Sequence, residues 1–149
     1  MTDWSSIKAI PVGGLVAVGF LDEHRVVVGS HSGLGVFDSA TGALLDRVED
    51  PGGDYAWFKD SPPTALYTGD DEQHSVPVAG LWGGTISSTT DDGWTCRIED
   101  AGARLSGPEG SLITVDDAEE PRACGFSSLG QVFVFATSPT LHVAVRASI

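Results

Sequence analysis

The chain has 149 residues, the length of a single domain that can bury a sizeable core without a disulfide or a metal ion. Its 21 Asp and Glu residues against 8 Lys and Arg residues give a formal net charge of −13, which excludes electrostatic attraction to nucleic acid or to an anionic membrane. The 19 glycines indicate many tight turns rather than helices, in which glycine is unfavourable.

Short strands are predicted along the first third of the chain. They are rich in β-branched residues and separated by Gly, Ser, Asp and Thr, which favour turns. Val26, Val27 and Val28 form a continuous apolar run, which is typical of a strand covered on both faces. The expected strands cover residues 4–10, 17–20, 25–30, 34–38 and 43–48.

The same pattern continues to the end of the sequence. Residues 69–75 and 116–120 are acidic and are expected to be solvated loops. No segment of about 11 residues or more has the periodicity of a helix, so the sequence predicts a single all-β domain over residues 1–149. The expected strands cover residues 55–58, 64–68, 76–82, 85–90, 94–99, 103–105, 111–115, 122–126, 131–136 and 141–146.

Three segments share one order of strands and turns: residues 17–38, 78–99 and 122–146. Each begins with a strand in which a glycine precedes a large apolar residue. A short turn, a second strand, another short turn and an alternating strand follow. The pattern predicts antiparallel sheets built from about three four-stranded repeats.

The repeats resemble the blades of WD40-type β-propellers. The matching pieces are VFDSATG at residues 36–42, FSSLG at residues 126–130 and the turn Asp92-Gly93-Trp94, although the Gly-His pair of that family is missing. The resemblance implies a propeller-like or barrel-like fold and says nothing about function. Three blades are too few for a ring of typically about four to eight. A homodimeric ring, a small barrel or sandwich, and four short blades all stay open.

Cysteine usage and the N-terminal sequence favour a cytoplasmic protein. Cys96 and Cys124 each lie in an expected strand among apolar neighbours, as buried free thiols do in a reducing compartment. A bridge between them requires that their strands lie face to face. The segment MTDWSSIKAI does not have the pattern of a signal peptide, and no window approaches the roughly 20 apolar residues of a membrane helix.

No motif for catalysis or cofactor binding stands out in the sequence. None of the four histidines has the spacing of metal ligands, so no metal site is expected. Ser30, His31 and Asp38 lack the context of a nucleophile elbow. No glycine-rich segment carries the lysine of a phosphate-binding loop, and no cofactor is expected.

Aromatic and acidic residues are the better candidates for a binding surface. Trp82 stands between glycines that shield it little, so it is either a core residue or an aromatic anchor at a rim. An anchor beside exposed acids suits a partner with a basic surface. The predicted partner-binding residues are His31, Asp70, Asp71, Glu72, His74, Trp82, Asp91, Asp92 and Trp94.

The sequence therefore favours a non-enzymatic protein-binding module, for example a small acidic immunity protein or inhibitor of a basic partner. One alternative is a lectin-like module that stacks sugars on Trp82 or Trp94. Another is a hydrolase or lyase that uses His31 or His74 as a base in a propeller funnel.

Overall fold

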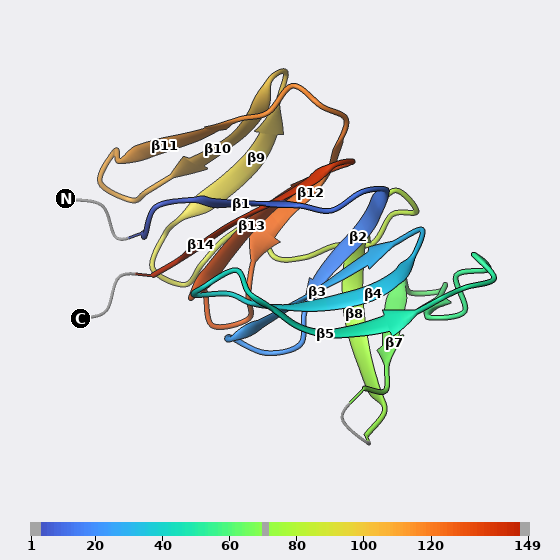
Figure 1. Cartoon of the computed structure of the whole chain (residues 1–149). Coiled ribbons are helices and arrows are strands. Elements are labelled where there is room, and N and C mark those ends of the chain that lie inside the picture. The colour runs from blue at the N-terminus through green and yellow to red at the C-terminus, as the bar shows by residue number, and fades with distance from the viewer. Residues whose placement is uncertain (1–3, 70–71, 147–149) are drawn as a thin grey trace.

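The computed structural model describes residues 4–69 and 72–146, and it confirms an all-β fold with antiparallel sheets (Figure 1). The four-stranded sheet contains, in spatial order, β1 (Lys8–Pro11), β14 (Thr140–Val145), β13 (Val132–Thr137) and β12 (Pro121–Phe126). The three-stranded sheet contains β11 (Leu112–Asp116), β10 (Gly102–Ser106) and β9 (Thr95–Glu99). The seven-stranded sheet contains β5 (Leu44–Glu49), β4 (Gly33–Asp38), β3 (Arg25–Ser30), β2 (Leu15–Phe20), β8 (His74–Gly80), β7 (Thr64–Tyr67) and β6 (Phe58–Lys59).

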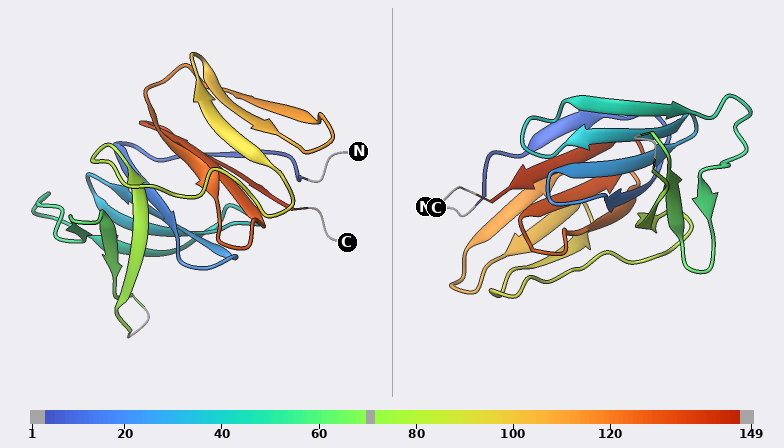
Figure 2. Two further views of the ribbon diagram at one scale, coloured as in Figure 1. Left: turned by 180° about the vertical axis from the view of Figure 1, so that it is seen from behind. Right: turned by 90° about the horizontal axis from the view of Figure 1, so that it is seen from below.

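The four-stranded sheet is a middle layer, with the three-stranded sheet on one face and strands β2 and β3 on the other (Figure 2). The alternation of side chains along β13 accounts for this position. Val132 and Val134 enter the core shared with β2 and β3. Phe133 and Phe135 enter the core shared with the three-stranded sheet. Because both faces are covered, all six residues of β13 are buried.

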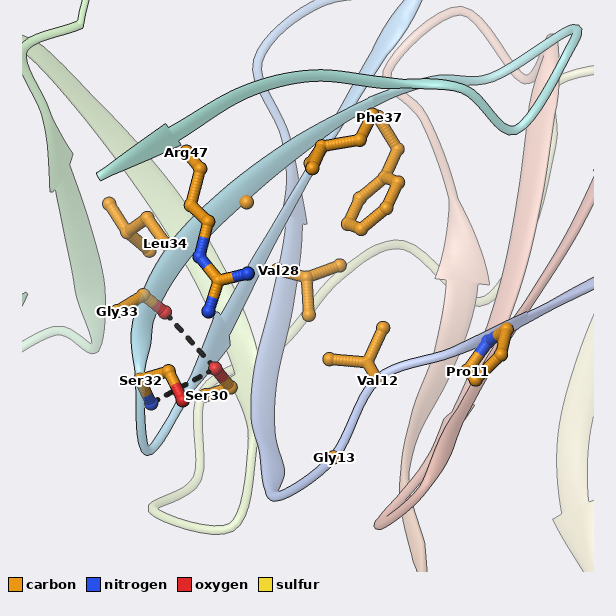
Figure 3. A pocket seen from close by; sticks show the side chains of 12 residues that line it. Pro11, Val12, Gly13, Val28, Ser30, Ser32, Gly33, Leu34, Phe37 and Arg47 are labelled. Atoms are coloured by element: carbon orange, nitrogen blue, oxygen red, sulfur yellow. Dashed lines mark hydrogen bonds between the residues drawn. The ribbon is translucent and has the colours of Figure 1, made fainter. Parts of the chain in front are cut away.

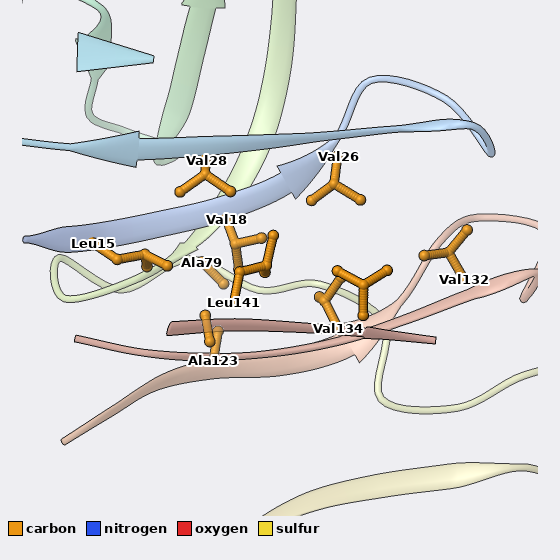
Figure 4. Close-up of a cluster of buried hydrophobic side chains, with 11 residues drawn as sticks. Leu15, Val18, Val26, Val28, Ala79, Ala123, Val132, Val134 and Leu141 are labelled. Atoms are coloured by element: carbon orange, nitrogen blue, oxygen red, sulfur yellow. The ribbon is translucent and has the colours of Figure 1, made fainter. Parts of the chain in front are cut away.

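Strand β3 is also covered on both faces, as its run of three valines predicts. Val26 and Val28 face the middle sheet, whose Val134 and Leu141 complete the same core (Figure 4). Val27 points the other way, into a separate core. One strand therefore contributes to two cores.

The seven-stranded sheet curls, and the fold thereby contains a half-barrel. Strands β5 and β7 are five positions apart in the sheet order, a distance of about 24 Å in a flat sheet. Yet the Tyr67 hydroxyl on β7 donates a hydrogen bond of 2.5 Å to the Asp46 carboxylate on β5. The face enclosed by the curl holds the third core, around Val27, Val36 and Trp57.

A single carboxylate joins two turns that lie far apart in the sequence. Glu23, in the turn between β2 and β3, accepts hydrogen bonds from the hydroxyls of Ser127 at 2.5 Å and Ser128 at 3.1 Å. It also accepts backbone N–H bonds from Leu129 at 3.1 Å and Gln131 at 3.4 Å. The bonds fix the β12–β13 turn against the seven-stranded sheet.

Replacing Glu23 with alanine is expected to lower the free energy of unfolding by about 1–2 kcal/mol, because the turn loses its shared acceptor. Urea unfolding at neutral pH measures the change. The control is Glu109→Ala in the exposed β10–β11 turn, which should stay within about 0.5 kcal/mol of the wild type. Equal effects of the two substitutions would contradict a specific role for Glu23.

The two ends of the described chain meet in the middle sheet. Strand β1 pairs with β14 from Lys8 opposite Val143 to Pro11 opposite Thr140. An isolated bridge between Trp4 and Arg146 extends the pairing. The guanidinium of Arg146 also lies 4.7 Å from the centre of the Trp4 ring. The N-terminal strand is therefore an edge strand of the sheet formed by the last three strands.

The three-repeat expectation is not confirmed, because only two of its segments fold as predicted. Residues 17–38 and 122–146 each form three sequential antiparallel strands. Residues 78–99 do not, since β8 lies in the seven-stranded sheet and β9 in the three-stranded one. Residues 85–90 form only isolated bridges rather than the expected strand. Positive φ angles at Gly83 and Gly84 turn the chain away after β8.

The strand expected at residues 55–58 is also wrong. Only Phe58 belongs to a strand, and residues 55–57 turn instead. Tyr55 has a φ of 55°, and its N–H donates to the Asp50 carboxylate at 2.7 Å. This local hydrogen bond competes with strand pairing, as Asp side chains often do in turns.

Candidate functional site

Five aromatic rings form one connected group, hereafter the aromatic cluster: His31, Tyr55, Trp57, Phe58 and Trp82. The Trp82 ring lies 4.7 Å from the centre of Tyr55 and 4.8 Å from that of Phe58. Trp57 lies 6.0 Å from Tyr55 and 6.4 Å from Trp82. His31 Nδ1 is hydrogen bonded to the Tyr55 hydroxyl. The cluster brings together the β3–β4 turn, the β5–β6 loop and the segment after β8.

Local backbone features place these rings. Gly29 on β3 leaves the space in which the Trp57 ring lies, and a Cβ at this position would overlap it. Trp57 is consequently buried, with 5% of its surface exposed, and it forms the buried side of the aromatic cluster. The left-handed conformation of Tyr55 turns its ring back toward Trp57 and Trp82.

The outer side of the aromatic cluster faces solvent. Trp82 is 38% exposed, and its neighbour Leu81 is 49% exposed. Asp54 and Asp60, both exposed, flank the three rings of the β5–β6 segment in sequence. Lys59 stands between Phe58 and Asp60, so residues 54–60 carry two acids and one base beside exposed aromatic area, which suits an anchor for a basic surface.

The structure places Glu72 and His74 away from Trp82. Glu72 and His74 lie at the start of β8, whereas Trp82 follows the end of that strand. Strand β8 has seven residues and so a length of about 20 Å, which lies between the two positions. His74 stacks on Tyr67 at 6.0 Å and faces Glu72 at 4.0 Å. Two further predicted residues, Asp70 and Asp71, lie outside the described part of the chain.

Asp91 and Asp92 lie in another part of the molecule, in the turn before β9. Asp92 accepts two hydrogen bonds from Arg146, at 2.7 and 2.9 Å. Hydrogen bonds from the Thr90 hydroxyl and from Arg146 hold the pKa of Asp92 below its usual range. Its charge is therefore already paired within the molecule. Asp91 is exposed.

Trp94 is a core residue and not a surface anchor. Only 2% of it is exposed, and its ring meets Trp4 edge to face at 5.9 Å. Gly107 permits this packing, because a Cβ there would press on the far edge of the Trp94 ring. The lectin alternative therefore loses one of its two stacking platforms.

Cys96 and Cys124 lie face to face on β9 and β12, with their Sγ atoms 3.5 Å apart. Both are free thiols. The hydrogen bond with Cys124, together with burial, raises the pKa of Cys96. The same hydrogen bond lowers the pKa of Cys124, which is also the more exposed of the two.

We expect iodoacetamide to modify Cys124 at least about tenfold faster than Cys96 at neutral pH, because the thiolate is the reactive form. Peptide mass spectrometry over a time course measures the two rates. The control is the Cys96→Ser variant, in which a hydroxyl replaces the thiol partner. Comparing the labelling rate of Cys124 in this variant with that in the wild type shows the effect of the Cys96 thiol. Equal labelling rates of the two cysteines in the wild type would contradict the assignment of Cys124 as the more reactive thiol.

A buried histidine–carboxylate pair was not singled out by the sequence. His142 Nε2 lies 2.8 Å from Asp117 Oδ2, and both side chains are about nine-tenths buried. The Thr137 hydroxyl donates to the same oxygen at 2.9 Å, and Phe135 stacks on the imidazole at 5.5 Å. The only sequence signal is an Asp near the start of an acidic loop and a His in an apolar strand. The pair joins the β11–β12 connection to the middle sheet.

Further observations concern metals, membranes and related proteins. Within residues 4–69 and 72–146, no group of three or more His, Cys, Asp or Glu side chains is placed to hold a metal ion. The same residues contain no helix long and apolar enough to cross a membrane.

Comparison with protein-family models, curated proteins and solved structures gives no match. Function is therefore inferred from the surface itself.

Proposed function

We propose that this chain is a protein-binding module that uses the aromatic cluster to contact a partner with a basic surface. The carrying observation is Trp82, which is 38% exposed although Tyr55 and Phe58 pack against it at 4.7 and 4.8 Å. A ring held by its neighbours loses little conformational entropy on binding, and large aromatic residues of this kind dominate interface energies.

Charge supports a basic partner. The chain carries 21 acidic against 8 basic residues, and Asp54 and Asp60 lie beside the rings in sequence. Opposite charge on the partner raises the association rate, and added salt lowers that rate more than it changes dissociation. An inhibitor or immunity protein of a basic enzyme is one kind of protein that acts through such a surface.

Peptide display provides a test that does not depend on knowing the partner. A random peptide library is selected on the wild type alone, and the selected peptides are then measured on the Trp82→Ala variant. The expected peptides are enriched in Lys and Arg beside an apolar residue. Their affinity for Trp82→Ala is expected to fall about 30-fold, the effect of a central interface residue. Fluorescence polarisation measures the affinities.

Charge variants complete this experiment. Asp54→Asn with Asp60→Asn should slow association of the selected peptides, whereas Asp100→Asn with Asp116→Asn, exposed on the three-stranded sheet, should not. Peptides that bind Trp82→Ala as tightly as the wild type would refute the surface. Peptides without basic enrichment would refute the basic partner.

A further inference from the structure

A pocket of about 320 Å³ opens between the end of β1 and the β3–β4–β5 part of the seven-stranded sheet (Figure 3). Its size is at the lower end of the range for small-molecule sites. One wall is the segment Pro11–Gly13, and the other carries Val28, Phe37 and Arg47. None of these residues belongs to the aromatic cluster.

Glycines create the hollow. Val28 on β3, Gly35 on β4 and Arg47 on β5 stand opposite one another and therefore share a face of the sheet. Ser30, Gly33 and Glu49 form the next row. At both rows β4 contributes no side chain of its own, and over Gly35 lie the edge of the Phe37 ring and the Leu44 side chain, 3.1 and 3.6 Å from where a Cβ would stand.

The lining has an electrostatic character opposite to that of the whole protein. Arg47 is its only charged residue, in a chain with 21 acidic residues. The guanidinium extends over the floor toward Ser30 and Gly33 (Figure 3). Its Nε lies 3.3 Å from Glu49, and the two side chains are 54% and 68% exposed. An ion pair this exposed contributes little, so the guanidinium remains available to another anion.

The rest of the lining combines apolar side chains with two serines and backbone polar groups. Val12, Val28 and Phe37 point into the pocket (Figure 3). Leu44 borders it and is 52% exposed, so apolar area remains uncovered at the rim. A ligand that matches this lining has one anionic group and an apolar body. A single planar guanidinium, with no second cation in the lining, suits a carboxylate better than a doubly charged phosphate.

We propose that this pocket binds a small amphipathic carboxylate. The carboxylate pairs with Arg47, and a body of about eight carbons covers Gly35 and contacts Val28, Phe37 and Leu44. The site is independent of the proposed protein-binding surface, so either proposal can fail without the other.

Titration with octanoate, followed by the amide NMR shifts of residues 33–37 and 44–47, tests the site. The expected result is saturable binding of octanoate, with weaker binding of its neutral counterpart octanol and none of acetate. Arg47→Gln should weaken octanoate at least tenfold and leave octanol unchanged. Arg97→Gln is the matched control, because Arg97 also pairs with a glutamate two residues later on an exposed strand.

Filling the floor provides a second test. A Cβ at Gly35 would lie 3.1 Å from the Phe37 ring edge, so Gly35→Ala requires only a small movement of that ring. Gly35→Leu fills the pocket further and should abolish octanoate and octanol binding together, with circular dichroism and thermal unfolding as the check that each variant folds. Four results would each overturn the proposal. Two of them are equal binding of octanoate and octanol, and equal effects of Arg47→Gln and Arg97→Gln on octanoate binding. The other two are NMR shifts confined to the aromatic cluster, and no saturation at millimolar octanoate.

Discussion

Replacing Trp94 with alanine is expected to lower the free energy of unfolding by about 3–5 kcal/mol, the largest effect predicted for this protein. The side chain is 2% exposed and lies against Trp4, and the guanidinium of Arg146 is 5.8 Å from its ring. Its removal leaves a cavity where the three-stranded sheet meets the middle sheet. Urea unfolding followed by far-UV circular dichroism measures the loss.

Two other substitutions sharpen this test. The buried Trp94 Nε1 has no hydrogen-bond partner among the described residues, so Trp94→Phe forfeits volume and no hydrogen bond and should cost less than the alanine substitution. Trp82→Ala should cost only about 1 kcal/mol, because that ring is partly exposed. Equal destabilisation by Trp82→Ala and Trp94→Ala would contradict the assignment of one to the surface and the other to the core.

Replacing Asp117 with alanine is expected to cost about 3 kcal/mol at neutral pH. The substitution leaves the buried His142 imidazole and the Thr137 hydroxyl without their shared acceptor, and a broken buried pair costs far more than a broken surface pair. Asp116→Ala is the matched control, since the preceding aspartate is exposed, and it should stay within about 0.5 kcal/mol of the wild type.

The effect of Asp117→Ala should also depend on pH. Burial alone raises the pKa of Asp117, but hydrogen bonds from His142, the Glu119 N–H and Thr137 outweigh burial and hold the pKa below its ordinary value of 3.8. A depressed pKa contributes stability that is present above the unfolded value and is lost as pH falls through the folded value. The difference between wild type and Asp117→Ala should be constant above about pH 5 and shrink below about pH 4. A difference that is unchanged in acid would contradict the role of the carboxylate.

Most strand positions can be predicted from the sequence because they depend on local information. Residues 25–30 contain three consecutive valines and end at a turn, and they form β3 with the expected bounds. The division into sheets depends on distant partners. Residues 78–99 read as one unit, yet β8 pairs with β2 and β9 with β10. Nothing within that segment specifies either partner.

The candidate site shows the same limit. Trp82 and Trp94 each adjoin a glycine, and their neighbours do not reveal which ring is buried. Burial of Trp94 depends on Gly107, which is distant in the sequence and leaves room for the Trp94 ring against the core. Tyr55 joins the aromatic cluster through a left-handed turn that the apolar pattern of residues 55–58 conceals. Glu72, one of the acidic residues predicted beside Trp82, lies at the other end of β8.

The pairing of β1 with β14 has a consequence for synthesis on the ribosome. Residues 8–11 are made well before their pairing partners, residues 140–143, so the growing chain holds this strand unpaired until residues 140–143 have been made. The middle sheet is completed only when β14 has left the exit tunnel. Because closing so long a loop is slow, the pairing of β1 with β14 is expected to be a late step in folding. A nascent chain stalled before residue 140 should therefore remain sensitive to protease in its first strand.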